Sequence, residues 1–139
     1  MSELVEYLNP PGACAAQGLY SHVGKAAGSD LLFVAGQLSV AADGSVAGKG
    51  DFAAQFKQVF ANLGDVLRGM DCDFNNVVKF TTYLVHSQDI DPFMELRAEL
   101  FPKVFRGPLY PPNTLLIVER LVKEAFLLEV EAIVRAPGR

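Results

Sequence analysis

The sequence has few of the side chains that most often build metal sites. Among its 139 residues there are two cysteines and two histidines. Cys14 and Cys72 lack metal-ligand spacing, so we expect free thiols and no bound metal or cofactor. His22 and His86 belong to no motif, and we expect both to be structural.

Positive charge is also scarce. The chain has 12 lysines and arginines against 16 acidic residues, which gives a net charge of −4. This balance argues against binding to a nucleic-acid phosphate backbone as the main activity.

Long apolar runs are absent as well. No stretch approaches the roughly 18 residues of a membrane span, so no membrane partner is expected. Residues 1–6 are acidic and lack the basic and apolar regions of a signal peptide. We therefore expect a cytoplasmic protein.

What the chain has in quantity is apolar surface. Half of its residues are hydrophobic. A chain of this length can build one core, so we predict a single domain over residues 1–139. The surplus apolar surface favours contact between identical subunits.

The first half of the chain predicts one strand and one helix. Residues 8–18 are rich in proline, glycine and alanine and predict an irregular arm. The apolar run 31–38 predicts a buried strand, and an Asp-Gly pair at 43–44 predicts a turn. Asp51 is a suitable N-cap for a helix that ends at Gly69. Its apolar residues recur at helical spacing: Phe52, Phe56, Val59, Phe60, Leu63, Val66 and Leu67.

The second half predicts a strand over residues 77–85 and a helix that begins at Asp91 and Pro92. A proline-rich loop should follow over residues 102–112. Strands over 114–121 and 126–134 then close the chain, and the turn between them predicts a hairpin.

This order of elements predicts an α+β domain with a mixed β-sheet and two helices packed on one face. The other face of the sheet needs a cover, and a partner subunit is the natural candidate. If the last two strands pair, Asn113 and Glu129 can face one pocket.

Several short motifs occur in an order that resembles the Rid family. This family, also called YjgF-type or endoribonuclease L-PSP, contains deaminases of reactive imine and enamine intermediates. The motifs are Val34-Ala35-Gly36-Gln37, Gly50-Asp51 with Gln55, Asn62-Leu63, Val78-Lys79 with Thr81, Pro111-Pro112 before a strand, and Glu129-Val130-Glu131-Ala132-Ile133. The resemblance runs from about Tyr20 to Ile133.

The resemblance implies a chorismate-mutase-like fold, assembled as a trimeric barrel with small-molecule clefts between subunits. It also implies roles for particular residues. Glu129 matches the catalytic glutamate, Tyr20 matches a cleft tyrosine, and Gly36 lines the cleft with backbone groups. Ala35 stands at a cleft position that is often serine, and Asn113 stands where the deaminases have an arginine.

Asn113 therefore marks a divergent subgroup that lacks the cleft arginine. Arginine binds a carboxylate through two charged donors, whereas asparagine is neutral. The exchange should weaken carboxylate binding by about tenfold or more. Arg106 in the proline-rich loop, or Arg97 on the second helix, could supply the missing cation.

Each of these residues also has a simpler interpretation. Asn113 suits a turn after two prolines, and Arg106 is typical of a solvated surface. The spacing of Glu129 and Glu131 is equally typical of solvated carboxylates at a sheet edge. Tyr20 alone would be an ordinary interface aromatic residue.

Three functions remain open at this point. The first is hydrolysis of imines, enamines or related small carbonyl-type compounds with Glu129 as the base. The second is a non-enzymatic trimer that binds a metabolite, which could be a carboxylate. The third and weakest is an endoribonuclease or translation inhibitor, because the chain is acidic.

Overall fold

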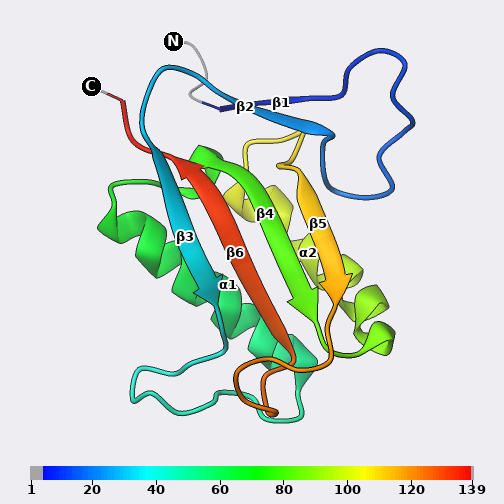
Figure 1. Cartoon of the computed structure of the whole chain (residues 1–139), viewed down its shortest axis with the longest axis vertical. Coiled ribbons are helices and arrows are strands. Elements are labelled where there is room, and N and C mark those ends of the chain that lie inside the picture. The colour runs from blue at the N-terminus through cyan, green and yellow to red at the C-terminus, as the bar shows by residue number, and fades with distance from the viewer. Residues whose placement is uncertain (1–4, 139) are drawn as a thin grey trace.

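A computed structural model describes residues 5–138 of the chain (Figure 1). Residues 1–4, on which part of the signal-peptide prediction rests, lie outside the described residues. A four-stranded sheet forms one layer and two helices form the other, as predicted. A separate two-stranded sheet of β1 (Val5–Leu8) and β2 (Val23–Ala26) lies at one end. The irregular segment between these two strands corresponds to the predicted arm.

The main sheet has the strand order β3-β6-β4-β5. The strands are β3 (Leu31–Gln37), β4 (Val77–Leu84), β5 (Asn113–Ile117) and β6 (Leu128–Arg135). β6 pairs antiparallel with both β3 and β4, whereas β5 pairs with β4 in parallel. The sheet is therefore mixed.

The predicted hairpin of the last two strands is wrong, because β4 lies between them. A helix connects β4 to β5, and such a crossover is what a parallel strand pair requires. Residues 118–127 then pass around the end of β4 to reach β6. Two backbone hydrogen bonds hold this passage, from Val118 N to Leu84 O at 2.8 Å and from Val85 N to Leu127 O at 3.3 Å.

Helix α1 (Phe52–Gly69) agrees with its prediction. The Asp51 side chain accepts a hydrogen bond from Ala54 N at 3.0 Å and caps the first turn. The apolar stripe of the helix is buried against the sheet. The left-handed residue after the helix is Asp71, with φ of 57°.

Helix α2 (Ile90–Val104) begins earlier and ends later than the sequence predicted. A 3₁₀ turn over Ser87–Asp89 leads directly into it, so Asp91 lies inside the first turn instead of capping it. Pro102 is helical although the sequence placed it in the loop. Tertiary packing of Phe101, which is 1% exposed, holds the last turn in place despite the proline.

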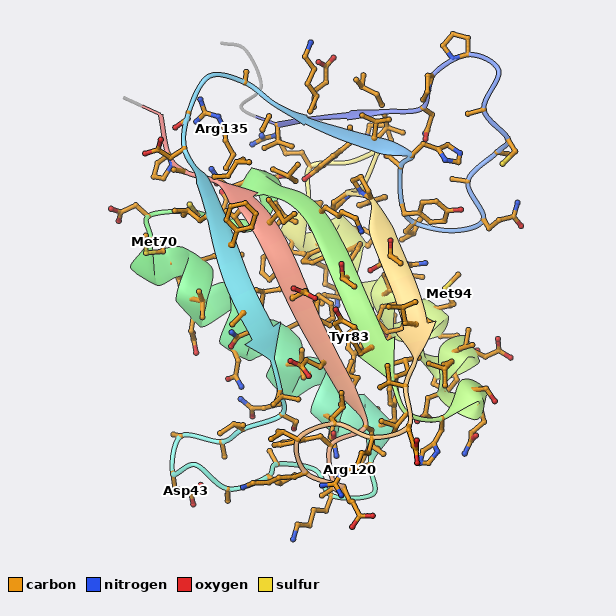
Figure 2. The ribbon with its side chains drawn as sticks, viewed as in Figure 1. Asp43, Met70, Tyr83, Met94, Arg120 and Arg135 are labelled. Atoms are coloured by element: carbon orange, nitrogen blue, oxygen red, sulfur yellow. The ribbon has the colours of Figure 1, made fainter. Side chains whose placement is uncertain are left out.

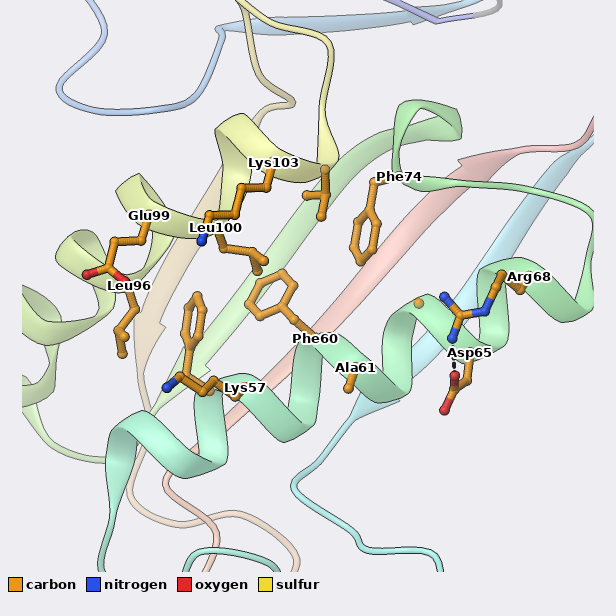
Figure 3. Close-up of a pocket in the computed structure, with 13 residues that line it drawn as sticks. Lys57, Phe60, Ala61, Asp65, Arg68, Phe74, Leu96, Glu99, Leu100 and Lys103 are labelled. Atoms are coloured by element: carbon orange, nitrogen blue, oxygen red, sulfur yellow. Dashed lines mark hydrogen bonds and ion pairs between the residues drawn. The ribbon is translucent and has the colours of Figure 1, made fainter.

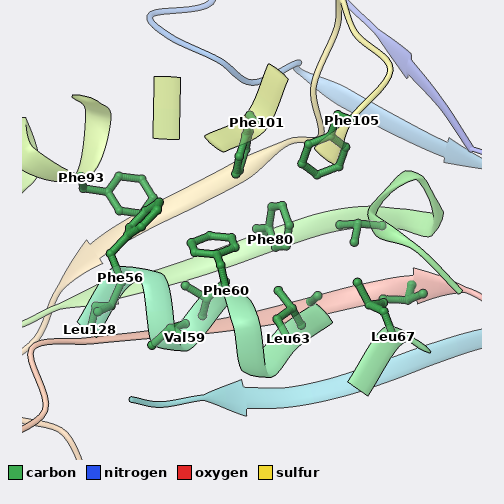
Figure 4. Packing of buried hydrophobic residues seen from close by; sticks show 14 of the residues in the cluster. Phe56, Val59, Phe60, Leu63, Leu67, Phe80, Phe93, Phe101, Phe105 and Leu128 are labelled. Atoms are coloured by element: carbon green, nitrogen blue, oxygen red, sulfur yellow. The ribbon is translucent and has the colours of Figure 1, made fainter. Parts of the chain in front are cut away.

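Phenylalanine rings fill the space between helices and sheet (Figure 4). The Phe56 and Phe60 centroids lie 4.7 Å apart, and the Phe101 and Phe105 centroids lie 4.8 Å apart. Phe80 joins the two pairs from the sheet at 6.0 Å from Phe60. The prediction that the α1 phenylalanines are core residues is confirmed.

The opposite face of the sheet, here called the open face, carries no helix (Figure 1). β3 lies at the edge of the sheet, and its Phe33 is 74% exposed. The prediction that this strand is buried is therefore wrong for the single chain. Leu31 and Leu116 are also exposed. None of the described helices is long and apolar enough to cross a membrane.

Gln55 ties α1 to the loops at the lower end of the sheet. Its amide nitrogen donates to Gly48 O at 3.1 Å and Ala125 O at 2.9 Å, and its oxygen accepts from Leu127 N at 2.9 Å. Gln55→Leu would leave these backbone groups without partners in a buried place. We expect a loss of about 2–4 kcal/mol in unfolding free energy, measured by urea denaturation.

The exposed glutamine Gln88 provides a matched control. Gln88→Leu should change the unfolding free energy by less than about 0.5 kcal/mol. Equal effects of the two variants would show that the three hydrogen bonds of Gln55 contribute nothing specific.

Candidate functional site

Glu129 lies in the middle of the sheet on its open face. Alternation along β6 buries Leu128 and Val130 under the helices and turns Glu129 the other way. On β4 its register partner is Tyr83. Glu129 is half-buried even in a single chain.

A hollow of about 390 Å³ opens beside Glu129. Gly36 of β3, Tyr83 of β4, and both Glu129 and Glu131 of β6 line it, together with Val118, Arg120, Leu121 and Val122 of the passage to β6. The structure thus brings together two of the predicted site residues, Glu129 and Gly36.

Gly36 is required by this arrangement. The pairing of β3 with β6 shifts register between Val34 and Gln37, so the ladder is irregular where Gly36 lies. A methyl group at position 36 would overlap the Glu129 carboxylate. A glycine here therefore lets backbone and carboxylate share one wall of the hollow.

The environment of Glu129 favours its protonated form. Burial raises the pKa of the Glu129 carboxyl, and the neighbouring Glu131 raises it further. The Tyr83 hydroxyl donates a hydrogen bond to Glu131, and this bond raises the pKa of Tyr83. Glu131 is thereby held by a partner, while Glu129 faces the hollow.

Lys79 is a further charged group on the open face. Its ammonium donates to Thr114 Oγ1 at 2.8 Å and Phe80 O at 3.2 Å. Burial lowers the pKa of Lys79, and the charge of Glu131 partly offsets this effect. The open face therefore combines two carboxylates, a phenol and a partly desolvated amine.

Arg120 is a cation in this hollow that the sequence analysis did not find. It lies in the loop below the sheet, whereas Tyr83 lies on the sheet itself (Figure 2). Its guanidinium donates to Leu121 O at 3.1 Å and Val122 O at 3.3 Å. The sequence predicted a strand over residues 114–121, whereas β5 ends at Ile117. Arg120 was therefore not considered as a residue of a loop beside the sheet.

Asn113 does not face the hollow of its own chain. Its side-chain oxygen accepts a hydrogen bond from Thr82 Oγ1 at 2.8 Å, and Thr82 is buried on the helix-covered face. Glu129 is on the open face. The sequence predicts that Asn113 and Glu129 face one pocket if their strands pair. The two strands do not pair, and within a single chain the two side chains lie on opposite faces of the sheet.

The remaining predicted residues lie elsewhere. Tyr20 is in the irregular loop 9–22, and its hydroxyl accepts from Gln17 N at 3.1 Å. Ala35 is exposed on β3 beside Gly36. Arg106 lines another hollow with Glu6 and Tyr7, next to the small sheet.

Another hollow, of about 440 Å³, lies between α1 and α2 on the helix face (Figure 3). Phe60, Phe74 and Leu100 are apolar residues that line it, and Lys57 and Lys103 are charged ones. It contains none of the predicted site residues. In residues 5–138 no group of three or more His, Cys, Asp and Glu side chains could hold a metal ion.

The mixed sheet with two helices on one face has the architecture that the resemblance to the Rid family implied. The chain belongs to the family whose model is described as Endoribonuclease L-PSP, which matches residues 11–136. A RutC family protein of Pyrococcus horikoshii is 34% identical over 84% of this chain and 86% of its own length. The rat 2-iminobutanoate/2-iminopropanoate deaminase is 32% identical over 96% of this chain and 92% of its own length. A Rid family protein of Yersinia pestis has the same fold, with a TM-score of 0.84 and 28% identity over 95% of this chain and 98% of its own.

The raised pKa of Glu129 leads to a prediction about stability. An acid whose pKa is raised on folding costs stability when it ionises, and the cost grows as pH rises above the ordinary value of 4.5. Glu129→Gln removes this cost. Its thermal midpoint should exceed that of the wild type by a few degrees at about pH 8 and equal it at about pH 4.

The exposed Glu124 serves as the control for this measurement. Glu124→Gln should leave the midpoint nearly unchanged at both pH values. A Glu129→Gln midpoint that falls at high pH would mean that the folded protein stabilises the ionised carboxylate.

Proposed function

We propose that this protein is a Rid-like hydrolase of small imines or enamines, with Glu129 as its acid and base. The observation that carries the proposal is a half-buried carboxylate of raised pKa at a hollow of about 390 Å³, next to the backbone of Gly36. The similarity to named imine deaminases supports the reaction class.

Hydrolysis of an imine needs one water molecule and a group that moves protons. Glu129 takes a proton from the water molecule while the water oxygen attacks the C=N carbon. Glu129 then returns that proton to the imine nitrogen. Further proton transfer and cleavage of the C–N bond release a carbonyl compound and ammonia. A carboxyl group whose pKa is raised above its usual range suits a role that first takes up and then returns a proton.

The substrate need not be a simple 2-imino acid. Asn113 offers a neutral amide where the deaminases have a cleft arginine, and its oxygen already accepts from Thr82. Carboxylate binding through this position should be about tenfold weaker or more. Neutral imines, and substrates whose carboxylate reaches another cation such as Arg120, fit the site better.

We further propose that three chains form the active assembly through their open faces. The exposed Phe33, Leu31 and Leu116 favour burial by a neighbour, since exposed apolar patches mark interfaces. Glu129 and Asn113 lie on opposite faces of one chain. They can share a cleft only if the two residues come from adjacent subunits.

Binding without catalysis is the second candidate. The hydrogen bond from Thr82 to Asn113 favours this candidate. It occupies the side-chain oxygen of Asn113 at the position where the deaminases bind the substrate carboxylate, while the hollow beside Glu129 remains available for a ligand. In that case the trimer would bind a small metabolite as a sensor or regulator.

An assay with amino-acid oxidase separates these two candidates. The oxidase generates 2-imino acids, and their disappearance is followed with and without this protein. We expect acceleration over buffer, and Glu129→Gln should reduce it about 100-fold or more. Glu99→Gln, a change on the helix face, should keep wild-type activity.

A series of neutral imines, prepared separately because amino-acid oxidase yields only 2-imino acids, tests the substrate class by the same loss of imine. Absence of acceleration with every imine would reject the hydrolase in favour of binding alone. Full activity of Glu129→Gln would reject Glu129 as the proton-transfer group.

Light scattering tests the assembly. The wild type should have the mass of three chains, and Phe33→Glu should shift it toward one chain, because a charge would be buried at the interface. Met70→Glu, at an exposed apolar residue that follows the last turn of α1 and lies away from the open face, is the control and should leave the mass unchanged. A wild-type mass of one chain would refute both the trimer and the shared cleft.

A further inference from the structure

Arg97 on α2 is a buried cation. It is 3% exposed, and its guanidinium carbon lies 5.2 Å from the centre of the Phe93 ring. Its Nη2 atom donates to the sulfur of Met94 at 2.9 Å, and thioether sulfur is a weak acceptor. The aromatic ring and the sulfur together provide far less stabilisation than the water that the guanidinium has lost.

No anion compensates this charge. Among residues 5–138 no carboxylate lies within the 4.0 Å of an ion pair with Arg97. The Nε atom of Arg97 has no hydrogen-bond partner. Burial accordingly lowers the pKa of Arg97, and Tyr20 partly offsets this effect. A guanidinium nevertheless stays charged in proteins, so a buried one requires an acceptor.

The loop of residues 9–22 covers this cation. A side-chain carbon on Gly18 would lie 2.8 Å from Arg97 Nη2, so the loop backbone touches the guanidinium. Ser21 in the same loop has a hydroxyl that is 1% exposed and also lacks a partner. Two unpartnered buried polar groups thus belong to Arg97 and the loop that covers it.

The loop is tied mainly to itself. His22 N donates to Asn9 Oδ1 at 2.9 Å, and the His22 ring bonds to Cys14 O at 2.5 Å. Gln17 N donates to the Tyr20 hydroxyl at 3.1 Å. Every hydrogen bond recorded for residues 9–22 joins two residues of this loop. None of these hydrogen bonds ties the loop to α2 or to the sheet, and Leu19 holds it to the hydrophobic core by packing.

We propose that Arg97 is the anchor of a second site, which binds the carboxylate of a small organic acid beneath the loop of residues 9–22. The planar guanidinium fork matches a carboxylate, and the free Nε–H supplies one of its two donors. Phe93 and Met94 beside it suit a short apolar tail. The loop backbone at Gly18 touches the guanidinium, so a bound carboxylate has to displace the loop there.

This site goes beyond the proposed hydrolase. Arg97 is not among the residues that line the hollow at Glu129, and its contacts are with α2 and the loop of residues 9–22. A carboxylate at Arg97 does not require catalysis at Glu129. Its binding should persist in Glu129→Gln, and this separates a failure of one proposal from a failure of the other.

Nuclear magnetic resonance of the arginine Nε–H groups tests the site directly. The full-length protein, exchanged into carboxylate-free buffer, is titrated with acetate and with 2-oxobutanoate. We expect a saturable downfield shift of the Arg97 Nε–H signal as the carboxylate accepts its hydrogen bond. Sodium chloride at equal ionic strength should not reproduce it, and Glu129→Gln should keep it.

Thermal unfolding of variants gives an independent measure. Carboxylate should raise the wild-type midpoint, and Arg97→Met should abolish this rise while unfolding no earlier than the wild type without ligand. Arg68→Met changes an exposed arginine paired with Asp65 and should retain the rise. Gly18→Ala, which crowds the guanidinium, should weaken binding at least tenfold.

Three outcomes would overturn the proposal. The first is no saturable shift at tens of millimolar carboxylate. The second is an equal shift with chloride. The third is an Arg97 Nε–H signal that is already downfield without ligand and moves upfield when the assembly is diluted to single chains, because a carboxylate of a second copy would then occupy the site.

Discussion

The strict alternation of β6 is the constraint on which the rest of the structure depends. β6 lies between β3 and β4, so its buried residues must meet α1 while its other residues meet neither helix. Leu128, Val130 and Val134 are fully buried, which fixes the register of both neighbouring strands. A slip of one residue would bury Glu129 in the phenylalanine core and expose the four apolar side chains Leu128, Val130, Ala132 and Val134.

This constraint also separates the polar chemistry of the chain. The open face holds Glu129 with Tyr83 and Lys79, whereas Asn113 and Arg97 lie on the covered side. Bases and ligand-binding groups on different faces cannot meet inside one chain. The proposed assembly through the open faces is what would bring such groups together, with Asn113 of one chain beside Glu129 of the next.

Predictions from the sequence succeeded where the deciding interactions are local. The apolar stripe and Asp51 cap of α1 depend on neighbours within a few residues, and both agree with the structure. The turn at Asp43 and Gly44 is equally local. The hairpin prediction failed because the turn residues between two strands do not show whether a third strand, here β4, lies between those strands in the sheet. Arg120 was missed for the same reason. It lies in the passage around the end of β4, and the sequence does not show that β4 separates the last two strands.

The sequence by itself determined the α+β class, the family and the identity of the carboxylate on the last strand. Periodicity and motif order encode these features, because they reflect local backbone geometry and the alternation of side chains. Tertiary structure alone decided which groups meet: Gly36 with Glu129, Thr82 with Asn113, and Gly18 with Arg97. Strand order and loop paths decide such contacts, and both arise from packing among residues far apart in the chain.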